Sequence, residues 1–243
     1  MNSNLQLYAL AVSGLATLDM HSLNNEGGEG NQIATRMVNI IDARGQMHNV
    51  NAVSGDMLKH IHAEHLHRLA VAAGLPLSEG ARTFNANRIN ADADFLATAE
   101  GLRDVEVLDK LLATCAVSDM MGILVTAGGR SLPRKSVVEY AWTVGVPGSV
   151  ETDSYFHVKY SNQRSKQERQ EAAGEEARRA NTGQAIFHRP ASSGQYAAVV
   201  NLELARIGFN EISQAYVVDE AGRKARHKVL LESLLYTFVE PSG

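Results

Sequence analysis

The sequence has a single cysteine, no long apolar run and no excess of basic residues, and each absence excludes a class of protein. Cys115 alone cannot form an intrachain disulfide, which favours a reducing compartment. The longest mostly apolar stretch, YALAVSGLATL, is too short to span a bilayer, and no basic segment with a cleavage site precedes it. We therefore expect a soluble cytoplasmic protein that does not bind a membrane.

The charge balance is slightly acidic, because 23 Lys and Arg residues stand against 27 Asp and Glu residues for a formal net charge of -4. Proteins that coat nucleic acid are usually basic overall, so any such role needs local basic patches. The 243 residues are 44% hydrophobic, which is enough to bury the core of one domain with insertions.

The first half of the chain predicts strands followed by a helix. Apolar positions alternate over residues 5–20, as in a half-buried strand. The Gly- and Asn-rich residues 21–32 are expected to form a flexible excursion instead of continuing the strand. A hairpin is predicted next, with the turn DARGQ joining residues 38–41 to residues 48–50. The helix that follows is expected from Asp56 to Ala73, capped by Ser54 or Asp56 and ended by Gly74.

The second half predicts short helices, two more strands and a closing helix. Residues 75–112 form a helical insertion, and SVVEYAWTVGV is a strand candidate. Residues 159–184 are highly charged and poor in apolar residues, so we expect a mobile loop or hairpin tip there. The strand after it should have one apolar face, comprising Tyr196, Ala198, Val200 and Leu202. The apolar side of the last helix comprises Val229, Leu230, Leu234 and Phe238. The fold class expected is α+β, with helices on one face of a mixed sheet.

Four histidines lie within eight residues in KHIHAEHLHRLA, which raises the question of a metal site, because imidazole is a common zinc ligand. At about 100 degrees per helical residue, His62 and His65 fall on the apolar face, while His60 and His67 point the other way. One metal ion cannot collect all four. The pattern favours buried, hydrogen-bonded histidines. A contact with a ligand, or a metal-dependent hydrolase site that uses His62 and His65, stays open as an alternative.

The segment AVSGDMLKH offers a second candidate site at the start of the same helix. Exposed backbone N–H groups, the small Gly55 and the nearby Lys59 could together cradle a phosphate. The plain alternative is an ordinary N-cap with a solvated lysine. Asp56 counts against a simple anion site, because it adds negative charge there.

Five stretches in order resemble one known family. They are SLNNEGGEGNQ, NVNAVSGDMLKHIHAEHL, CAVSDMMGILV, RKSVVEYAWTVGVPG and FHRPASSGQYAAVVNLELARIGFN. Together they resemble the DevR-type branch of the CRISPR-associated Cascade backbone subunit, over about residues 5–240. The resemblance implies a single domain with a ferredoxin-like palm of the RNA-recognition (RRM) type. A finger insertion would lie at about residues 75–112, and a thumb hairpin at about residues 152–190.

The resemblance also implies a function without catalysis and without a cofactor. In this family, copies of the subunit polymerise into a helical filament along the guide RNA (crRNA) of a type I complex. They grip the RNA backbone and present the guide for pairing with target DNA, beside the other Cascade subunits. The family usually continues with a further strand and tail beyond FVEPSG, so we expect a truncation near that end.

The resemblance and the local sequence together predict two sets of residues that would contact RNA. Arg36 and Arg44 could equally be ordinary surface charge, and His60 stands where the family commonly has a more basic residue. The RNA-binding set comprises Ser22, Asn24, Arg36, Arg44, Ser54, Gly55, Asp56, Lys59 and His60. The thumb set comprises Arg164, Lys166, Phe187 and His188. An apolar Phe187 would suit a wedge beside a displaced base. As an alternative, some relatives cut target RNA with an aspartate in the loop after the first strand, and Asp19 lies near that place.

Overall fold

The computed structural model describes residues 7–22, 25–29, 32–160 and 184–241 and confirms the α+β fold class. The chain divides into two compact units, each described here by itself. The helical unit comprises Met1–Gly14, Ser54–Trp142 and Ala198–Gly243. The hairpin unit comprises Leu15–Val53 and Thr143–Ala197. The predicted boundaries of a finger and a thumb within one domain stay predictions.

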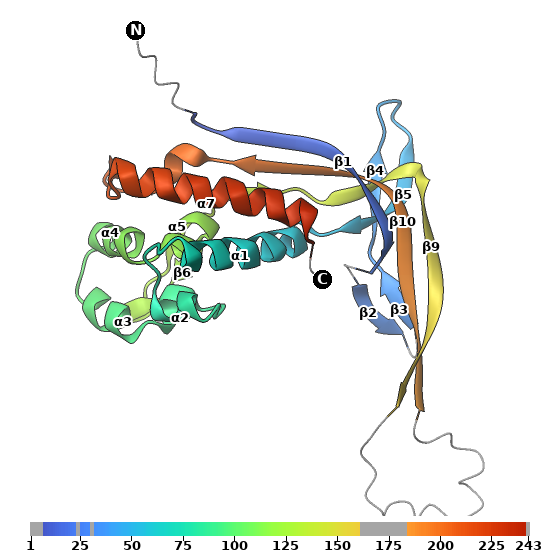
Figure 1. Cartoon of the computed structure of the whole chain (residues 1–243), viewed down its shortest axis with the longest axis horizontal. Helices are drawn as coiled ribbons and strands as arrows, with labels where there is room; N and C mark the ends of the chain where they lie inside the picture. Colours follow the sequence, from blue (N-terminus) through green and yellow to red (C-terminus); the bar gives the residue numbers. More distant parts are fainter. Residues whose placement is uncertain (1–6, 23–24, 30–31, 161–183, 242–243) are drawn as a thin grey trace, which may run out of the picture. The chain divides into compact units, whose positions relative to one another are not determined.

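The helical unit contains most of the core and all of the described α-helices. Its helices are α1 (Gly55–Ala72), α2 (Glu79–Arg82), η1 (Arg88–Ala91), α3 (Ala93–Ala99), α4 (Asp104–Thr114), α5 (Ala116–Met121), η2 (Ala127–Gly129), η4 (Leu204–Arg206) and α7 (Glu220–Val239). Its short strands are β6 (Ile123–Val125), β7 (Leu132–Arg134), β8 (Val138–Tyr140), β11 (Phe209–Asn210) and β12 (Ala215–Tyr216). Helices α1 and α7 pack along each other (Figure 1).

Helix α1 has the bounds that its local signals predict. The Ser54 hydroxyl accepts a hydrogen bond from the backbone N–H of Met57, as an N-cap should. At the other end, Gly74 has φ +65°, and the N–H of Leu75 donates to the carbonyl of Ala70 at 3.0 Å. This is the Schellman arrangement, which favours glycine because an L side chain is strained at positive φ.

Helix α7 confirms three of the four predicted apolar positions. Val229, Leu230 and Leu234 are buried in the core, whereas Phe238 is 43% exposed. The prediction for Phe238 is wrong, because the buried stripe at this end of α7 runs through Ser233 and Thr237, and Phe238 lies about 100 degrees around the helix from Thr237. No helix among the described residues is long and apolar enough to cross a membrane.

The hairpin unit is built from long strands. They are β1 (Leu10–His21), β2 (Asn25–Glu29), β3 (Gln32–Thr35), β4 (Met37–Ile41), β5 (Met47–Val53), β9 (Thr143–Tyr160) and β10 (Gln184–Leu202), and the ends of β1 and β10 continue into the helical unit. The strand order is β2-β3-β10-β9-β5-β4, with β1 also paired to β10. The pairs β2–β3, β9–β10, β5–β9 and β4–β5 are antiparallel, whereas β3 and β10 run parallel.

The predicted flexible excursion at residues 21–32 is wrong, because much of it forms strands β2 and β3. Gln32 of β3 pairs with His188 of β10, a residue far away in the sequence. Local composition disfavours a strand here, but pairing with an existing strand edge satisfies the backbone and overrides that preference.

Strands β9 and β10 form one long hairpin, with a register running from Gln184 opposite Tyr160 to Ala197 opposite Val144 (Figure 1). The register shifts between Gly194 and Tyr196, and a Cβ on Gly194 would lie 2.1 Å from the carbonyl oxygen of Ser149. Only glycine therefore fits at this irregularity. The predicted apolar face from Tyr196 to Leu202 is buried as expected. Of the loop or tip predicted at residues 159–184, Lys159 and Tyr160 end β9 and Gln184 begins β10, and residues 161–183 lie outside the described residues.

Candidate functional site

The first two turns of α1 and the segment that follows α2 enclose a pocket of about 260 Å³ within the helical unit, here called the α1 pocket. Its polar and aromatic lining residues are Asp56, Lys59, His60, Phe84, Asn85 and Arg88, and its small apolar lining residues are Ala63, Ala81, Ala86 and Val117. Three of the nine residues in the predicted RNA-binding set therefore share one pocket. Phe84 and Arg88 were not predicted, because nothing in the local sequence links them to α1.

The α1 pocket holds two half-buried cations. Burial, together with the positive charge of Arg88, lowers the pKa of Lys59. Among the described residues, Lys59 forms no ion pair, and the nearby acid Glu139 is engaged by Lys135 at 2.7 Å. Arg88 donates to the carbonyl of Gly122, a neutral partner. Asp56 in the same pocket and Glu139 attract Lys59, but Lys59 and Arg88 still repel each other, so a phosphate or carboxylate placed between them would be stabilised.

Phe84 is the second unusual feature of the α1 pocket. It has φ +54°, and the N–H of Asn85 donates to the carbonyl of Gly80 at 2.9 Å, so Phe84 occupies the position after α2 where glycine is usual. Its side chain is nevertheless 36% exposed. The ring centroid lies 5.8 Å from that of His60 and 5.1 Å from that of His67. An exposed aromatic residue in a strained backbone conformation is a feature that clusters at functional sites.

Ser54 and Gly55 have structural explanations instead. Ser54 caps α1 through its hydroxyl, and a Cβ on Gly55 would lie 2.4 Å from the carbonyl oxygen of Tyr140. The small size of Gly55 is therefore required by the protein's own backbone. Their predicted role in RNA binding stays a prediction.

The remaining predicted residues belong to the hairpin unit or lie outside the described residues. Arg44 is exposed in the turn between β4 and β5, Arg36 lies between β3 and β4, and Ser22 is exposed directly after β1. Phe187 pairs with His157 through the backbone of β10, and the ring of His188 lies 5.8 Å from that of Phe156. The residues outside the described part are Asn24, Arg164 and Lys166.

Asp19 does not lie in the loop where the nuclease alternative needs it. Strand β1 continues to His21, so Asp19 is an exposed residue within the strand. The residue after it, Met20, donates its backbone N–H to the Ser193 hydroxyl at 2.8 Å, which holds this part of β1 in the hairpin unit.

His62 and His65 are buried, as the helical unrolling predicts, and both nitrogens of each ring are engaged in hydrogen bonds. The Ser233 hydroxyl donates its proton to the carbonyl of Leu230, so the Ser233 oxygen accepts a hydrogen bond from Nε2–H of His62 at 2.8 Å. The other ring nitrogen of His62, Nδ1, accepts a hydrogen bond from the Tyr140 hydroxyl at 3.1 Å. His65 donates from Nε2 to the carbonyl of Glu240 at 2.9 Å and accepts from Arg68 at Nδ1. Neither ring has a nitrogen free for a metal ion, so this pair is structural.

The burial of His62 makes the folded state sensitive to acid. Burial lowers the pKa of His62 from 6.5 to about 4, so the folded protein resists a proton that the unfolded chain accepts. The neutral His62 ring therefore contributes to the free energy of unfolding in full above pH 6.5, and this contribution is lost as the pH falls toward 4. Between pH 7 and pH 5, we expect this group to lower the free energy of unfolding by about 2 kcal/mol, measured by urea unfolding at both values. A His62→Gln variant should lose less stability over the same interval, and an unchanged dependence would rule out His62 as its source.

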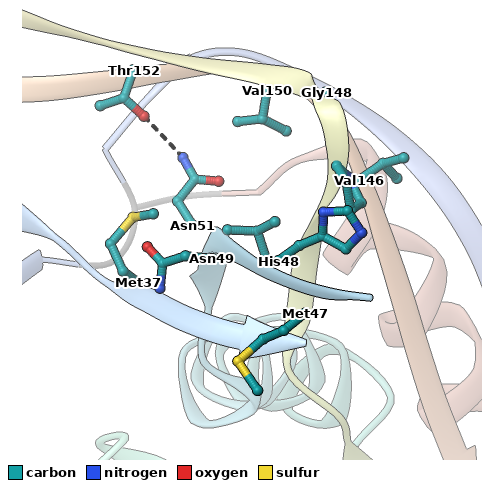
Figure 2. Close-up of a pocket in the computed structure, with 11 residues that line it drawn as sticks. Met37, Met47, His48, Asn49, Asn51, Val146, Gly148, Val150 and Thr152 are labelled. Atoms are coloured by element: carbon teal, nitrogen blue, oxygen red, sulfur yellow. Dashed lines mark hydrogen bonds between the residues drawn. The ribbon is translucent and has the colours of Figure 1, made fainter. Parts of the chain in front are cut away.

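The hairpin unit has a cavity of its own, of about 360 Å³, between the β4–β5 hairpin and residues 146–152 of strand β9 (Figure 2). Asn51 in its wall donates to Thr152 at 3.1 Å and to Ser192 at 2.8 Å, and it accepts from the Tyr196 hydroxyl at 2.8 Å. Asn51 is thus committed to holding the strands together. The eleven lining residues include no lysine or arginine, so this cavity lacks the charge that would hold a phosphate.

Comparisons with known proteins point to one family. A family model described as "CRISPR-associated negative auto-regulator DevR/Csa2" matches residues 12–243. The chain is 28% identical over 238 residues to a "CRISPR-associated protein Cas7/Cst2/DevR" of Methanocaldococcus jannaschii, covering 93% of this chain and 72% of that protein. A solved chain of a "CRISPR RNA-guided surveillance complex, pre-nicking" shares the fold with a TM-score of 0.54 at 13% identity, over 93% of this chain and 71% of the other.

Proposed function

Because the chain belongs to the DevR/Csa2 family of CRISPR-associated proteins, we propose that it binds crRNA as the backbone subunit of a type I surveillance complex, Cascade. The observation that carries the proposal is the α1 pocket, where the unpaired Lys59 and the half-buried Arg88 accompany an exposed aromatic ring. The resemblance in sequence selected Lys59 for RNA contact, and the fold adds Arg88 and Phe84 from another segment.

The proposed binding is to the RNA backbone and does not read the base sequence. Phosphate contacts fix the register of a nucleic acid, while pairing between guide and target carries the sequence information. A subunit that holds only a short stretch of guide needs a few local cations, so a formal net charge of -4 is compatible with this function. Copies repeated along the guide would form the filament, with the β9–β10 hairpin of each copy as the thumb.

We propose no catalysis for this chain. The nitrogens of His62 and His65 are occupied by protein partners, which removes the ligands of the hydrolase alternative. Asp19 is exposed on strand β1, and among the described residues no group of three or more His, Cys, Asp or Glu side chains is arranged to hold a metal ion.

The proposed function is tested by purifying the protein from cells that express a CRISPR array. We expect it to carry RNA, giving a raised ratio of absorbance at 260 nm to that at 280 nm. Nuclease digestion should then leave protected fragments in regular steps, because each copy covers the same length of guide. Protein from the same cells without the array is the control and should carry no such ladder. Protein free of RNA from array-expressing cells would contradict the function.

A further inference from the structure

We propose that the α1 pocket holds one ribonucleotide, with its base stacked on Phe84, its phosphate between Lys59 and Arg88, and its ribose hydroxyl on Asp56. This inference rests on the proposed crRNA binding and deepens it by naming the groups that contact a single nucleotide. The pocket, of about 260 Å³, is lined by the two cations, the carboxylate and the ring that one nucleotide would contact.

The backbone conformation of Phe84 is the first support for a stacking role. At φ +54° in the turn that ends α2, glycine would be free of strain, whereas an aromatic side chain is strained. The ring of Phe84 is only partly covered, because 36% of the residue stays exposed, and its neighbours include the rings of His60 and His67. An aromatic ring kept at such a position and turned toward a pocket is a platform for a flat ligand such as a base.

The close packing beneath Phe84 shows that its position is rigidly held. A Cβ on Gly80 would lie 2.3 Å from the carbonyl oxygen of Arg88, so α2 and η1 approach each other as closely as backbones can. The same Gly80 accepts the hydrogen bond from Asn85 that closes the turn around Phe84. This packing fixes the segment that brings Phe84 and Arg88 to the lining of the pocket, which Lys59 of α1 also lines.

The charges of the α1 pocket set the orientation of the nucleotide. Lys59 and Arg88 repel each other, and a phosphate between them removes that repulsion. Asp56 repels a phosphate but accepts a hydrogen bond from a hydroxyl group, and the structure gives its exposed side chain no hydrogen-bond partner among the described residues. The ribose 2′-hydroxyl is the donor that distinguishes RNA from DNA. The arrangement therefore predicts a preference for RNA.

The stacking contact is tested with the full chain and a fluorescein-labelled single-stranded RNA of roughly 12 nucleotides, within the site size of single-strand binders, by fluorescence anisotropy. Phe84→Gly relieves the backbone strain and should melt as cooperatively as wild type, yet we expect its affinity to fall roughly 5- to 100-fold, the range for loss of one stacked base. Phe84→Tyr keeps a ring and should retain the affinity. Phe238→Ala removes an exposed aromatic residue outside the pocket and should also leave the affinity unchanged.

The results separate failure of this inference from failure of the proposed function. If wild type and Phe84→Gly bind the RNA equally well, the stacking assignment is overturned while RNA binding stands. If folded wild type binds no RNA and carries none from array-expressing cells, the function itself fails, and the inference fails with it.

The role of Asp56 is tested by comparing RNA with DNA of the same sequence. Asp56→Ala removes the acceptor for the ribose hydroxyl and also a negative charge, so DNA affinity should rise relative to RNA affinity. We expect the ratio of the two affinities to fall by roughly tenfold, the value of a hydrogen bond to a charged group. Equal changes for RNA and DNA would overturn the assignment of Asp56 to the ribose.

Discussion

Replacing Asp119 by Asn is expected to lower the free energy of unfolding by about 3–5 kcal/mol, because it removes the charge that compensates two buried arginines. Asp119 is fully buried, and its carboxylate oxygens contact Arg134 and Arg226 at 2.6 Å each. It also accepts the backbone N–H of Gly208 at 2.9 Å. An amide cannot accept from all three donors. Arg226 would then lose its carboxylate partner in the core, whereas Arg134 would keep its second ion pair, with Glu211.

The loss matters to the candidate site because this network joins the elements of the helical unit. Asp119 lies on α5, Arg134 on β7 and Arg226 on α7, the helix that packs along α1. Arg134 also donates to the carbonyls of Phe209 and Arg206. A weakened network therefore loosens the support of α1 and of the α1 pocket.

Urea unfolding followed by circular dichroism measures the effect as a shift of the transition midpoint at constant slope. Glu106→Gln is the matched control, because it also converts a carboxylate to an amide, but in an exposed pair with Arg103. Its transition should coincide with that of wild type, because exposed ion pairs contribute little. A midpoint of Asp119→Asn equal to that of wild type would show that the buried network does not stabilise the fold.

The second large effect is expected from Lys59→Glu. The change replaces a pocket cation by an anion beside Asp56, so we expect RNA affinity to fall by roughly 10- to 100-fold, the value of a lost charge-assisted contact. It should also reduce the slope of log affinity against log salt by about 0.7, the value for one phosphate contact on a single strand. Both quantities are measured by titrating labelled single-stranded RNA at several salt concentrations.

Lys228→Glu is the matched control for this experiment. It makes the same change in net charge on α7, at an exposed position that does not line the α1 pocket. Its affinity and salt dependence should stay near those of wild type. If both variants weaken binding equally, the effect comes from net charge, and the assignment of Lys59 to a phosphate is wrong.

Much of the fold follows from local sequence signals. The bounds of α1 follow from the cap at Ser54 and the turn at Gly74, and the β4–β5 hairpin follows from the DARGQ turn. The burial of His62 and His65 follows from their place on the apolar face of the helix. These features depend on backbone preferences and periodicity over a few residues, which the sequence displays directly.

Features that depend on distant partners were missed or wrongly predicted. Strands β2 and β3 form because β10 offers an edge for pairing, despite a composition that disfavours strands. Phe238 is exposed although its spacing from Leu234 matches the buried face of α7, because the buried stripe passes through Thr237 at this end of the helix. The buried ion pairs of Asp119 join residues up to 107 positions apart, and no local pattern marks them.

The candidate site likewise has one part that the local sequence predicts and one part that depends on contacts between distant segments. The sequence by itself determined that a capped helix begins at Ser54 and carries Lys59 near its start, and its resemblance to a known family predicted that this helix contacts RNA. Only the tertiary structure decided that Phe84 and Arg88 complete a pocket around that lysine. The physical reason is that a cap and a helical face arise from neighbouring residues, whereas a pocket arises from the packing of segments that the chain brings together only when it folds.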